Sequence, residues 1–327
     1  MSDILDLAAG NLISPIILSF VLGVFAALAR SDLTIPEAVA KGMSIYLLFA
    51  IGFKGGAGVA AHGIDTTLVL TLIAASILSF GLPFVGYALL SVMSSFDTID
   101  KAAVAAHYGS ISIVTFVAAT SVLQAQGIAS EGYLVAAAAV MEAPAILSAL
   151  WIVARVGGST SGTVDAGLYR EILLNGSIVL LVGSFLIGAI TGEDGLETIA
   201  PFIVAPFQGV LCLFLLDMGL VAGRGLRESK GELGFGPISF GILMPLIGSC
   251  FGLIAALLVG LSPGGAALLM TLSASASYIA VPAAMRVALP EARPSIYLTL
   301  SLGVTFPFNL TVGIPLYTAL SASFIGG

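Results

Sequence analysis

Long apolar segments, separated by short charged or Gly/Pro-rich joints, run along almost the whole chain. A helix needs about 20 apolar residues to cross a hydrocarbon core of about 30 Å, and this pattern predicts ten membrane-spanning helices. We place them at residues 12–29, 38–61, 66–93, 101–125, 132–154, 170–191, 200–223, 235–259, 264–286 and 294–321. The predicted fold class is therefore an all-α polytopic membrane protein without a large water-soluble domain.

Composition narrows the class of protein further. Of the 327 residues, 58% are hydrophobic and only 9% are charged, whereas a soluble domain carries about a quarter charged residues. This excludes a soluble globular protein. The net charge of −7 and the lack of a basic run argue against nucleic acid as a partner and leave the lipid bilayer as the surroundings. Cys212 and Cys250 both fall inside apolar runs, which predicts neither a disulfide framework nor a metal site.

The basic residues are distributed unevenly between the two sides of this topology. Sorting all eleven Lys and Arg residues by alternate loops leaves Lys54 alone on one face. Because basic loops favour the cytoplasm, the opposite face is predicted to be cytoplasmic, with both termini outside. The N-terminus lacks the basic start of a cleaved signal peptide, so we keep the first span. The cytoplasmic set is Arg30, Lys41, Lys101, Arg155, Arg170, Arg224, Arg227, Lys230, Arg286 and Arg293.

A Gly/Ser/Thr-rich segment at residues 156–169 divides the chain into the halves 1–155 and 170–327. Five predicted spans lie in each half, so the second half begins on the opposite side of the membrane. Ser110-Ile111-Ser112 recurs 165 positions later as Ser275-Ala276-Ser277. We therefore predict two inverted five-helix repeats joined by a cytoplasmic linker. Further matches are Gly52 and Gly56 with Gly219 and Gly223, 167 positions on, and Pro83 and Gly86 with Pro245 and Gly248, 162 positions on.

Two clusters of small polar residues interrupt predicted spans near mid-membrane. The fourth span reaches Gly109 after eight residues from the cytoplasmic side, about 12 Å of helix, and the ninth reaches Ser273 after nine residues from outside. Interrupted helices at matching places in two repeats are typical of a transporter's binding site, and the N–H groups of a restarted helix favour a small oxyanion. The alternative is that these residues only pack helices closely. The candidate substrate-binding residues are Gly109, Ser110, Ser112, Ser273, Ala274, Ser275 and Ser277.

Three oxygen-bearing side chains within predicted spans are candidates for holding a small hard cation. Glu142 lies near the middle of the fifth span, Asp217 lies about two turns from the cytoplasmic end of the seventh, and Asn309 interrupts the tenth. Carboxylate, amide and freed carbonyl oxygens are the ligands that such cations prefer. The alternatives are a snorkelling end residue for Asp217 and a buried partner of Lys54 or His107 for Glu142.

Lys54 and His107 are the other ionisable residues of interest. Lys54 falls among glycines in the outer half of the second span, where it either attracts an anion at the entrance or marks the end of the span. His107 precedes the first break by two residues, and both helix packing and a proton-linked role fit it. The chain has no HExxH motif and no GxSxG motif with a base nearby, so we expect no catalytic residues and no enzyme.

Several segments, in their proper order, resemble the SbtA-type sodium-dependent bicarbonate transporter family. The string LLFAIGFKGG at residues 47–56 is the most distinctive of them. The resemblance covers essentially the full chain. The other segments are NLISP at 11–15, SDLTIP at 31–36, HYGS at 107–110 and ASASYIAVPAA at 274–284 followed by Arg286.

The resemblance implies a symporter of the bacterial plasma (inner) membrane, in which a core domain moves against a gate domain, each built from both repeats. It implies a homotrimer, a trimeric PII-like cytoplasmic regulator named SbtB, and sodium as the coupling ion without any other cofactor. Bicarbonate would lie between the two helix breaks, on Gly109, Ser110, Ser112, Ala274, Ser275 and Ser277. The implied sodium ligands are Glu142, Asp217 and Asn309.

Three other transport functions remain open at this point. The first is sodium-coupled uptake of another small carboxylate or oxyanion at the same site. The second is cation/proton antiport, which would require a carboxylate within the breaks, where the sequence has none. The third is a passive anion channel, whose flux would not depend on sodium.

Overall fold

The computed structural model describes residues 14–63, 65–156, 176–228, 233–278, 281–282, 285 and 289–325. All regular elements within these residues are helices, which confirms the predicted all-α class. Apart from Val156, the predicted linker lies outside the described residues, as do both chain ends and residues 170–175 of the predicted sixth span.

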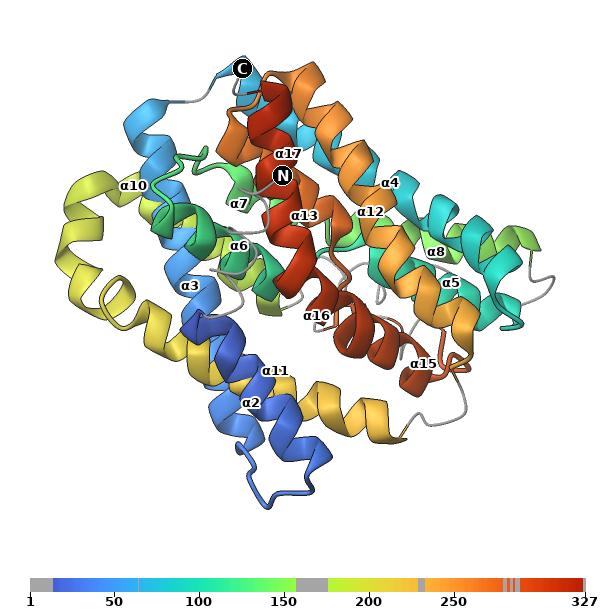
Figure 1. Ribbon diagram of the computed structural model, residues 1–327. Helices are drawn as coiled ribbons and strands as arrows, with labels where there is room; N and C mark the ends of the chain where they lie inside the picture. Colours follow the sequence, from blue (N-terminus) through green and yellow to red (C-terminus); the bar gives the residue numbers. More distant parts are fainter. Residues whose placement is uncertain are drawn as a thin grey trace.

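Figure 1 shows the arrangement of the helices. In chain order they are α2 (Pro15–Leu28), α3 (Glu37–His62), α4 (Thr66–Met93), α5 (Thr98–Gly109), α6 (Ile113–Ala125), α7 (Leu134–Val140), α8 (Ala143–Val156), α10 (Gly176–Ile203), α11 (Phe207–Glu228), α12 (Phe235–Val259), α13 (Pro263–Ala274), α15 (Pro294–Leu298), α16 (Phe306–Phe308) and α17 (Ile314–Ile325). Two π-helical stretches, η1 (Thr299–Thr305) and η2 (Asn309–Gly313), flank α16.

Eight helical stretches among the described residues are long and apolar enough to cross a membrane. Two of the ten predicted spans, 12–29 and 264–286, correspond to shorter apolar helices, α2 with 14 residues and α13 with 12. Residues 12–13 lie outside the described part, and α13 ends because the chain becomes extended at Ser275. The described residues establish a multi-pass membrane protein, and the count of ten remains a prediction.

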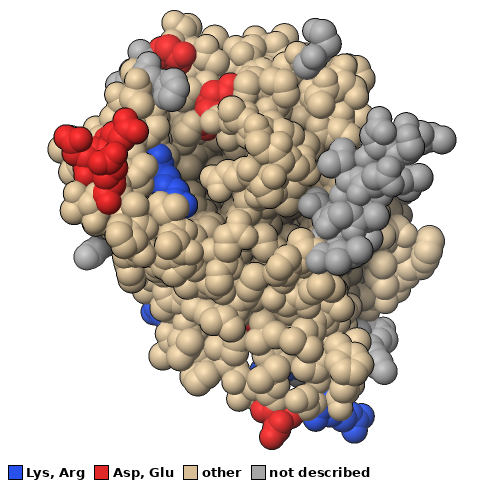
Figure 2. Space-filling model, turned by 60° about the vertical axis from the view of Figure 1, so that its left-hand side comes forward, with Lys and Arg blue, Asp and Glu red and all other residues tan. Residues whose placement is uncertain are grey.

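Large apolar side chains cover the outside of the helices. Phe25, Ile77, Ile190 and Leu258 are 67%, 66%, 84% and 81% exposed. Figure 2 shows a broad band without charged side chains, with charged groups gathered toward the upper and lower parts of the view. Soluble monomers rarely expose contiguous apolar surface of this kind, so the band faces the hydrocarbon core of the bilayer.

Helix α10 is divided at the predicted end of the sixth span. Hydropathy predicts an end at residue 191, and the backbone is non-helical at Gly192, beyond which a second helical segment runs to Ile203. Gly192 has a φ of 62°, a left-handed value that glycine adopts readily, and kinks the helix between its apolar and polar parts. The predicted end of the sixth span therefore coincides with this kink.

The helices form two groups (Figure 1). The first bundle consists of α2, α3, α10 and α11, in which α3 packs along α10 and α2 packs along α11. The second bundle consists of α4, α5, α6, α8, α12, α13 and α17. Both interrupted helices therefore belong to the second bundle.

Glycines allow the closest approaches within the first bundle. Gly56 on α3 lies against the Phe185 carbonyl, and Gly219 on α11 lies against the Phe20 carbonyl, so that a Cβ at either glycine would overlap that oxygen. Phe20 and Phe185 are 165 positions apart, and the two glycines are 163 apart. By their contacts, Gly56 of the first half corresponds to Gly219 of the second half. The sequence match instead aligns Gly219 with Gly52, which lies one helical turn before Gly56.

The fifth and tenth predicted spans are irregular as well. α7 ends at Val140, and a turn at Met141 and Glu142 precedes α8. In the tenth span, the two π-helical stretches lie on either side of α16, which contains Pro307. Proline lacks a backbone donor, and π-helical turns often occur at functional sites. Irregular backbone therefore occurs in four of the predicted spans of the second bundle.

Candidate functional site

The first break separates α5 from α6. α5 ends at Gly109, Ser110 is extended with φ −92° and ψ 161°, and α6 starts after Ser112. The Ser112 hydroxyl caps α6, because it accepts hydrogen bonds from Thr115 N–H at 3.2 Å and from Thr115 Oγ1 at 2.9 Å. A Cβ at Gly109 would overlap the ring of Pro83. Glycine is therefore what allows α5 to lie this close to α4.

The second break follows α13 and has the same layout. α13 ends at Ala274, and Ser275 is extended with φ −85° and ψ 163°. The Ser275 hydroxyl donates to the Leu272 carbonyl at 2.9 Å. Ser277 Oγ accepts a hydrogen bond from Val281 N–H at 3.4 Å, which parallels the capping role of Ser112. Both predicted interruptions are confirmed as breaks in the helical backbone.

Two hydrogen bonds join the breaks where they cross. Ser112 N–H donates to Ser275 Oγ at 2.9 Å, and Ser277 N–H donates to the His107 carbonyl at 2.7 Å. The crossing is closed to solvent, since Ser110 and the three other serines at these positions are each at most 3% exposed. Residues from the two halves of the chain therefore build one buried polar site.

Several hydrogen-bond donors at this crossing have no acceptor. The hydroxyls of Ser110 and Ser273 are buried without a partner. A helix leaves its first N–H groups without intrahelical acceptors. Within the described residues, the N–H groups of Ile113 and Val114 at the start of α6 have no acceptor. An unpaired buried donor costs about 1–3 kcal/mol. A small anion that accepts from these groups would offset that cost.

The predicted substrate residues thus divide into two kinds. Ser110 and Ser273 have free hydroxyls, whereas the hydroxyls of Ser112, Ser275 and Ser277 already bind backbone groups. Gly109 and Ala274 end the helices that enter the site and contribute backbone only.

Asn309 ties the second break to the tenth span. Its Nδ2 donates to the Ala274 carbonyl at 2.9 Å, and its Oδ1 accepts a hydrogen bond from Tyr317 OH at 2.9 Å. An amide oxygen has two lone pairs, so Oδ1 keeps one for a cation. The residue is buried completely, at 0% exposure.

Glu142 lies close to the first break. The preceding carbonyl, of Met141, accepts a hydrogen bond from Ser79 Oγ at 2.6 Å, and the Ser79 carbonyl in turn lies against Gly109. Glu142 is 5% exposed, and its Oε2 has no partner. Within the described residues Glu142 forms no ion pair. The alternative role, as a buried partner of Lys54 or His107, is therefore not observed among these residues.

Asp217 lies on a helix of the first bundle, unlike the other two predicted cation ligands. It belongs to α11 of the first bundle and is 6% exposed. Within the described residues, no hydrogen bond or ion pair links it to either break, and no three or more His, Cys, Asp or Glu residues group to hold a metal ion. Any cation at this site would therefore depend on neutral oxygens as well as carboxylates.

Aromatic residues beside the breaks form a wall that sequence reasoning did not assign. Tyr108 OH donates to Thr305 Oγ1 at 2.6 Å, because the Thr305 hydroxyl itself donates to the Gly241 carbonyl at 2.6 Å. Tyr278 packs edge to face on Phe306 with ring centroids 5.4 Å apart. The sequence indicates these two tyrosines only by their position next to the clusters of small residues. It does not indicate their partners, which lie far away along the chain.

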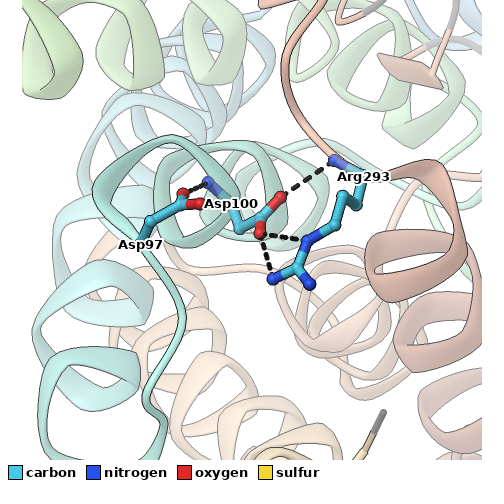
Figure 3. A network of polar contacts seen from close by, with 3 residues as sticks. All are labelled: Asp97, Asp100 and Arg293. Atoms are coloured by element: carbon cyan, nitrogen blue, oxygen red, sulfur yellow. Dashed lines mark hydrogen bonds and ion pairs between the residues drawn. The ribbon is translucent and has the colours of Figure 1, made fainter.

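An ion pair fastens the start of α5 to the tenth span (Figure 3). Arg293 Nε and Nη2 reach Asp100 Oδ2 at 2.7 and 2.6 Å, and Arg293 N–H donates to Asp100 Oδ1 at 2.8 Å. Asp97 accepts a hydrogen bond from Asp100 N–H at 2.8 Å and so caps α5. Asp100 is 2% exposed. We call this contact the α5 anchor.

A carboxylate anchors the start of α13 in a comparable way. Glu131 Oε1 accepts a hydrogen bond from Ser262 N–H at 2.7 Å, and Glu131 Oε2 accepts one from the Ser262 hydroxyl at 2.9 Å. Glu131 lies in the connection just before the fifth span, as Arg293 lies just before the tenth. We call this contact the α13 anchor. Each broken helix is thus held at its far end by the connection that precedes the fifth span of the other half.

Comparison with known proteins gives one finding on the family. The family model of the Na+-dependent bicarbonate transporter superfamily matches residues 15–322, a region that includes both breaks. A search of curated proteins gives no match. A family of transporters implies transport rather than enzymatic catalysis, with sodium as the coupling ion. The chain therefore belongs to the Na+-dependent bicarbonate transporter superfamily.

Proposed function

We propose that this protein imports bicarbonate together with sodium across a bacterial plasma membrane and binds the anion where the two breaks cross. The observations that carry the proposal are the buried, unpartnered hydroxyls of Ser110 and Ser273, one at each break, and the free N–H groups at the start of α6. No acidic residue occurs within 109–112 or 273–277. Neutral donors of this kind suit a small oxyanion and spare the cost of a charged arginine in the membrane.

The two bundles support transport by alternating access. The second bundle carries both breaks and corresponds to a core domain, and the first bundle corresponds to a gate domain. Close glycine contacts hold α3 to α10 and α2 to α11, so the first bundle is suited to act as a rigid body. Rocking of one such body against the other would expose the site to each side in turn.

The packing also supports two inverted repeats, residues 1–155 and 170–327. The pairs α2 with α11 and α3 with α10 each take one helix from each half. Their glycine contacts repeat at offsets of 163 and 165 residues, and the serines at the breaks repeat at 165. A duplication, after which each helix packs against a helix of the other half, accounts for the mixed helix pairs and for the repeated offsets.

Sodium is proposed to bind oxygens close to the breaks. Glu142 has a free oxygen near the first break, and Asn309 Oδ1 has a free lone pair near the second. Asp217 would contribute from the first bundle, which would link sodium binding to the movement of that bundle. The ligand set would then combine carboxylate, amide and carbonyl oxygens, as a hard cation requires.

The second candidate function is sodium-coupled uptake of another small carboxylate or oxyanion. The same hydroxyl and N–H donors favour it, because they recognise an anionic oxygen rather than the rest of the molecule. Cation/proton antiport would need a carboxylate in the breaks, and a passive channel would need no sodium.

The remaining predictions extend the proposal to assembly and topology. They are a homotrimer, a PII-like regulator of the SbtB type on the cytoplasmic face, and both termini outside. The topology can be tested by labelling a single cysteine at residue 161 in intact cells with an impermeant reagent, which should leave it unmodified. A cysteine near Gly326 should react under the same conditions.

The test of function is uptake of labelled bicarbonate by purified protein in liposomes. With sodium outside, uptake should be saturable, and replacement of sodium by potassium or choline should reduce it to background. Competition by unlabelled formate, acetate and nitrate distinguishes bicarbonate from the second candidate class. Flux that does not depend on sodium would contradict symport.

A further inference from the structure

A cavity lined by both polar and apolar residues lies between the two bundles, away from the crossed breaks. Its volume is about 150 Å³, whereas one water needs only roughly 10–15 Å³ of such space. A small hydrated ion therefore fits. One wall consists of Ile51, Lys54 and Gly55 on α3 and Phe207 on α11, and the facing wall includes Phe116, Thr120 and Gln124 on α6.

The cavity leads toward the first break and is closed before it. Phe116, Thr120 and Gln124 are spaced four residues apart and so share one face of α6. Phe116 lies about one turn beyond the first break and is 1% exposed, and Ile51 and Leu268 line the same cavity with exposures of 5% and 1%. Gln124 at the other end is exposed. The cavity is thus polar at its outer end and apolar where it approaches the break.

Lys54 contributes a positive charge to this cavity and is not paired directly with a carboxylate in the part of the chain that the structure describes. Its Nζ lies 4.4 Å from the centre of the Phe207 ring, and within the described residues it forms no ion pair. Glu131 also lines the cavity, but both of its oxygens bind Ser262 in the α13 anchor. Figure 2 shows a basic side chain set back in a hollow, with acidic side chains nearby on the surface.

An adjoining cavity of about 520 Å³ is lined by a further acidic residue, Asp65. Asp65 lines that cavity, and its Oδ1 accepts a hydrogen bond from Leu68 N–H at 2.7 Å, which caps α4. The Thr120 hydroxyl donates to the Phe116 carbonyl at 2.9 Å and is therefore not a free donor. The donors that line the cavity and remain for an anion include the Lys54 ammonium and the Gln124 amide.

A half-buried ammonium that forms no direct ion pair is costly within a membrane protein. We propose that Lys54, with the Gln124 amide, forms a second, outer anion site that captures bicarbonate before it passes the apolar closure at Phe116. The identity of the anion rests on the proposed function, whereas the site itself rests on the cavity and on the Lys54 ammonium, which forms no direct ion pair among the described residues. The ring of Phe207 holds the ammonium over the cavity through a cation–π contact.

The first test compares uptake kinetics at saturating sodium. Lys54→Gln should raise the external bicarbonate concentration for half-maximal uptake about fivefold, the effect of losing a charge interaction of about 1 kcal/mol. The maximal rate should stay within about twofold, and Lys54→Arg should stay close to the parent. Lys41→Gln, a matched loss of charge at an exposed position of the same helix, should change nothing. An unchanged half-saturation in Lys54→Gln would overturn the proposal.

The second test does not depend on transport. In a Cys212→Ser, Cys250→Ser background, Gln124→Cys is labelled with an anionic and a cationic thiosulfonate of similar size. The anionic reagent should be favoured, addition of Lys54→Gln should lower the ratio of the two rates about fivefold, and bicarbonate should slow labelling only while Lys54 is present. An unchanged ratio overturns the outer site even if the parent transports bicarbonate with sodium. A Lys54-dependent ratio in a parent without sodium-dependent uptake supports the site and contradicts the proposed function.

Discussion

The two helix breaks have the same backbone layout but use their serines differently. Ser110 and Ser275 occupy corresponding positions, 165 residues apart, and both are extended. The Ser110 hydroxyl is free, whereas the Ser275 hydroxyl bridges the Leu272 carbonyl and Ser112 N–H. A repeated sequence can therefore reproduce the geometry of a site while one copy keeps a free hydroxyl and the other uses its hydroxyl to join the two breaks.

The largest effect on transport is expected when a bulky side chain fills the space beside the free Ser110 hydroxyl. Ser110→Leu should abolish saturable bicarbonate uptake, because the leucine occupies the volume next to the N–H groups at the start of α6 and also removes the hydroxyl. Ser91→Leu, at an exposed position of α4, is the matched control and should retain uptake within about twofold. Retained uptake in a folded Ser110→Leu protein would contradict the assignment.

Removing only the hydroxyls separates the two roles. Ser110→Ala should raise the bicarbonate concentration for half-maximal uptake about ten- to hundredfold with little change in melting temperature, since a hydrogen bond to a charged group contributes roughly 1.5–3 kcal/mol. Ser275→Ala should instead lower the stability by about 1 kcal/mol through loss of the bond from Ser112 N–H. Thermal melting measured together with uptake kinetics distinguishes the two variants. If Ser110→Ala lowered the stability and Ser275→Ala raised the half-saturating bicarbonate concentration, the roles of the two serines would be the reverse of those proposed.

The proposed sodium ligands give a further comparison, because Glu142 lies near the first break and Asn309 near the second. Glu142→Gln should raise the sodium concentration for half-maximal uptake about tenfold without loss of thermal stability, because Oε2 has no partner in the described structure. Asn309→Ala should raise it too, and should also lower the melting temperature, because two hydrogen bonds are lost. An unchanged sodium dependence in folded Glu142→Gln would remove Glu142 from the ligand set.

The two anchors differ in charge and should differ in strength. Asp100→Asn weakens a charge-assisted contact to a guanidinium and should cost about 1–2 kcal/mol of stability, reduced by the exposure of Arg293, whose side chain is 52% exposed. Glu131→Gln keeps one acceptor for Ser262 and should cost about 1 kcal/mol or less. Thermal melting at low and high salt checks this, and only the Asp100→Asn difference should shrink with salt.

The sequence predicts most of the fold because lipid imposes long apolar spans, and it predicts both breaks because small polar residues interrupt those spans. It does not predict that Ser112 and Ser277 cap helices, since a serine at a break serves equally as a cap or as a ligand. The bond between Tyr108 and Thr305 joins residues 197 positions apart, so no local pattern reveals it. The π-helical stretches of the tenth span have the same hydropathy as a regular helix and are equally hidden.

The central claim is that the crossed breaks bind the anion, and bicarbonate-dependent thermal stabilisation of the detergent-solubilised protein tests it most directly. In sodium, bicarbonate at a hundred times its dissociation constant should stabilise the parent by about 2.7 kcal/mol, and Ser91→Leu should gain as much. Ser110→Leu should melt as a folded protein and gain nothing from bicarbonate. If Ser110→Leu folds, keeps its oligomeric state and gains the same stability as the parent, the anion does not bind at the breaks.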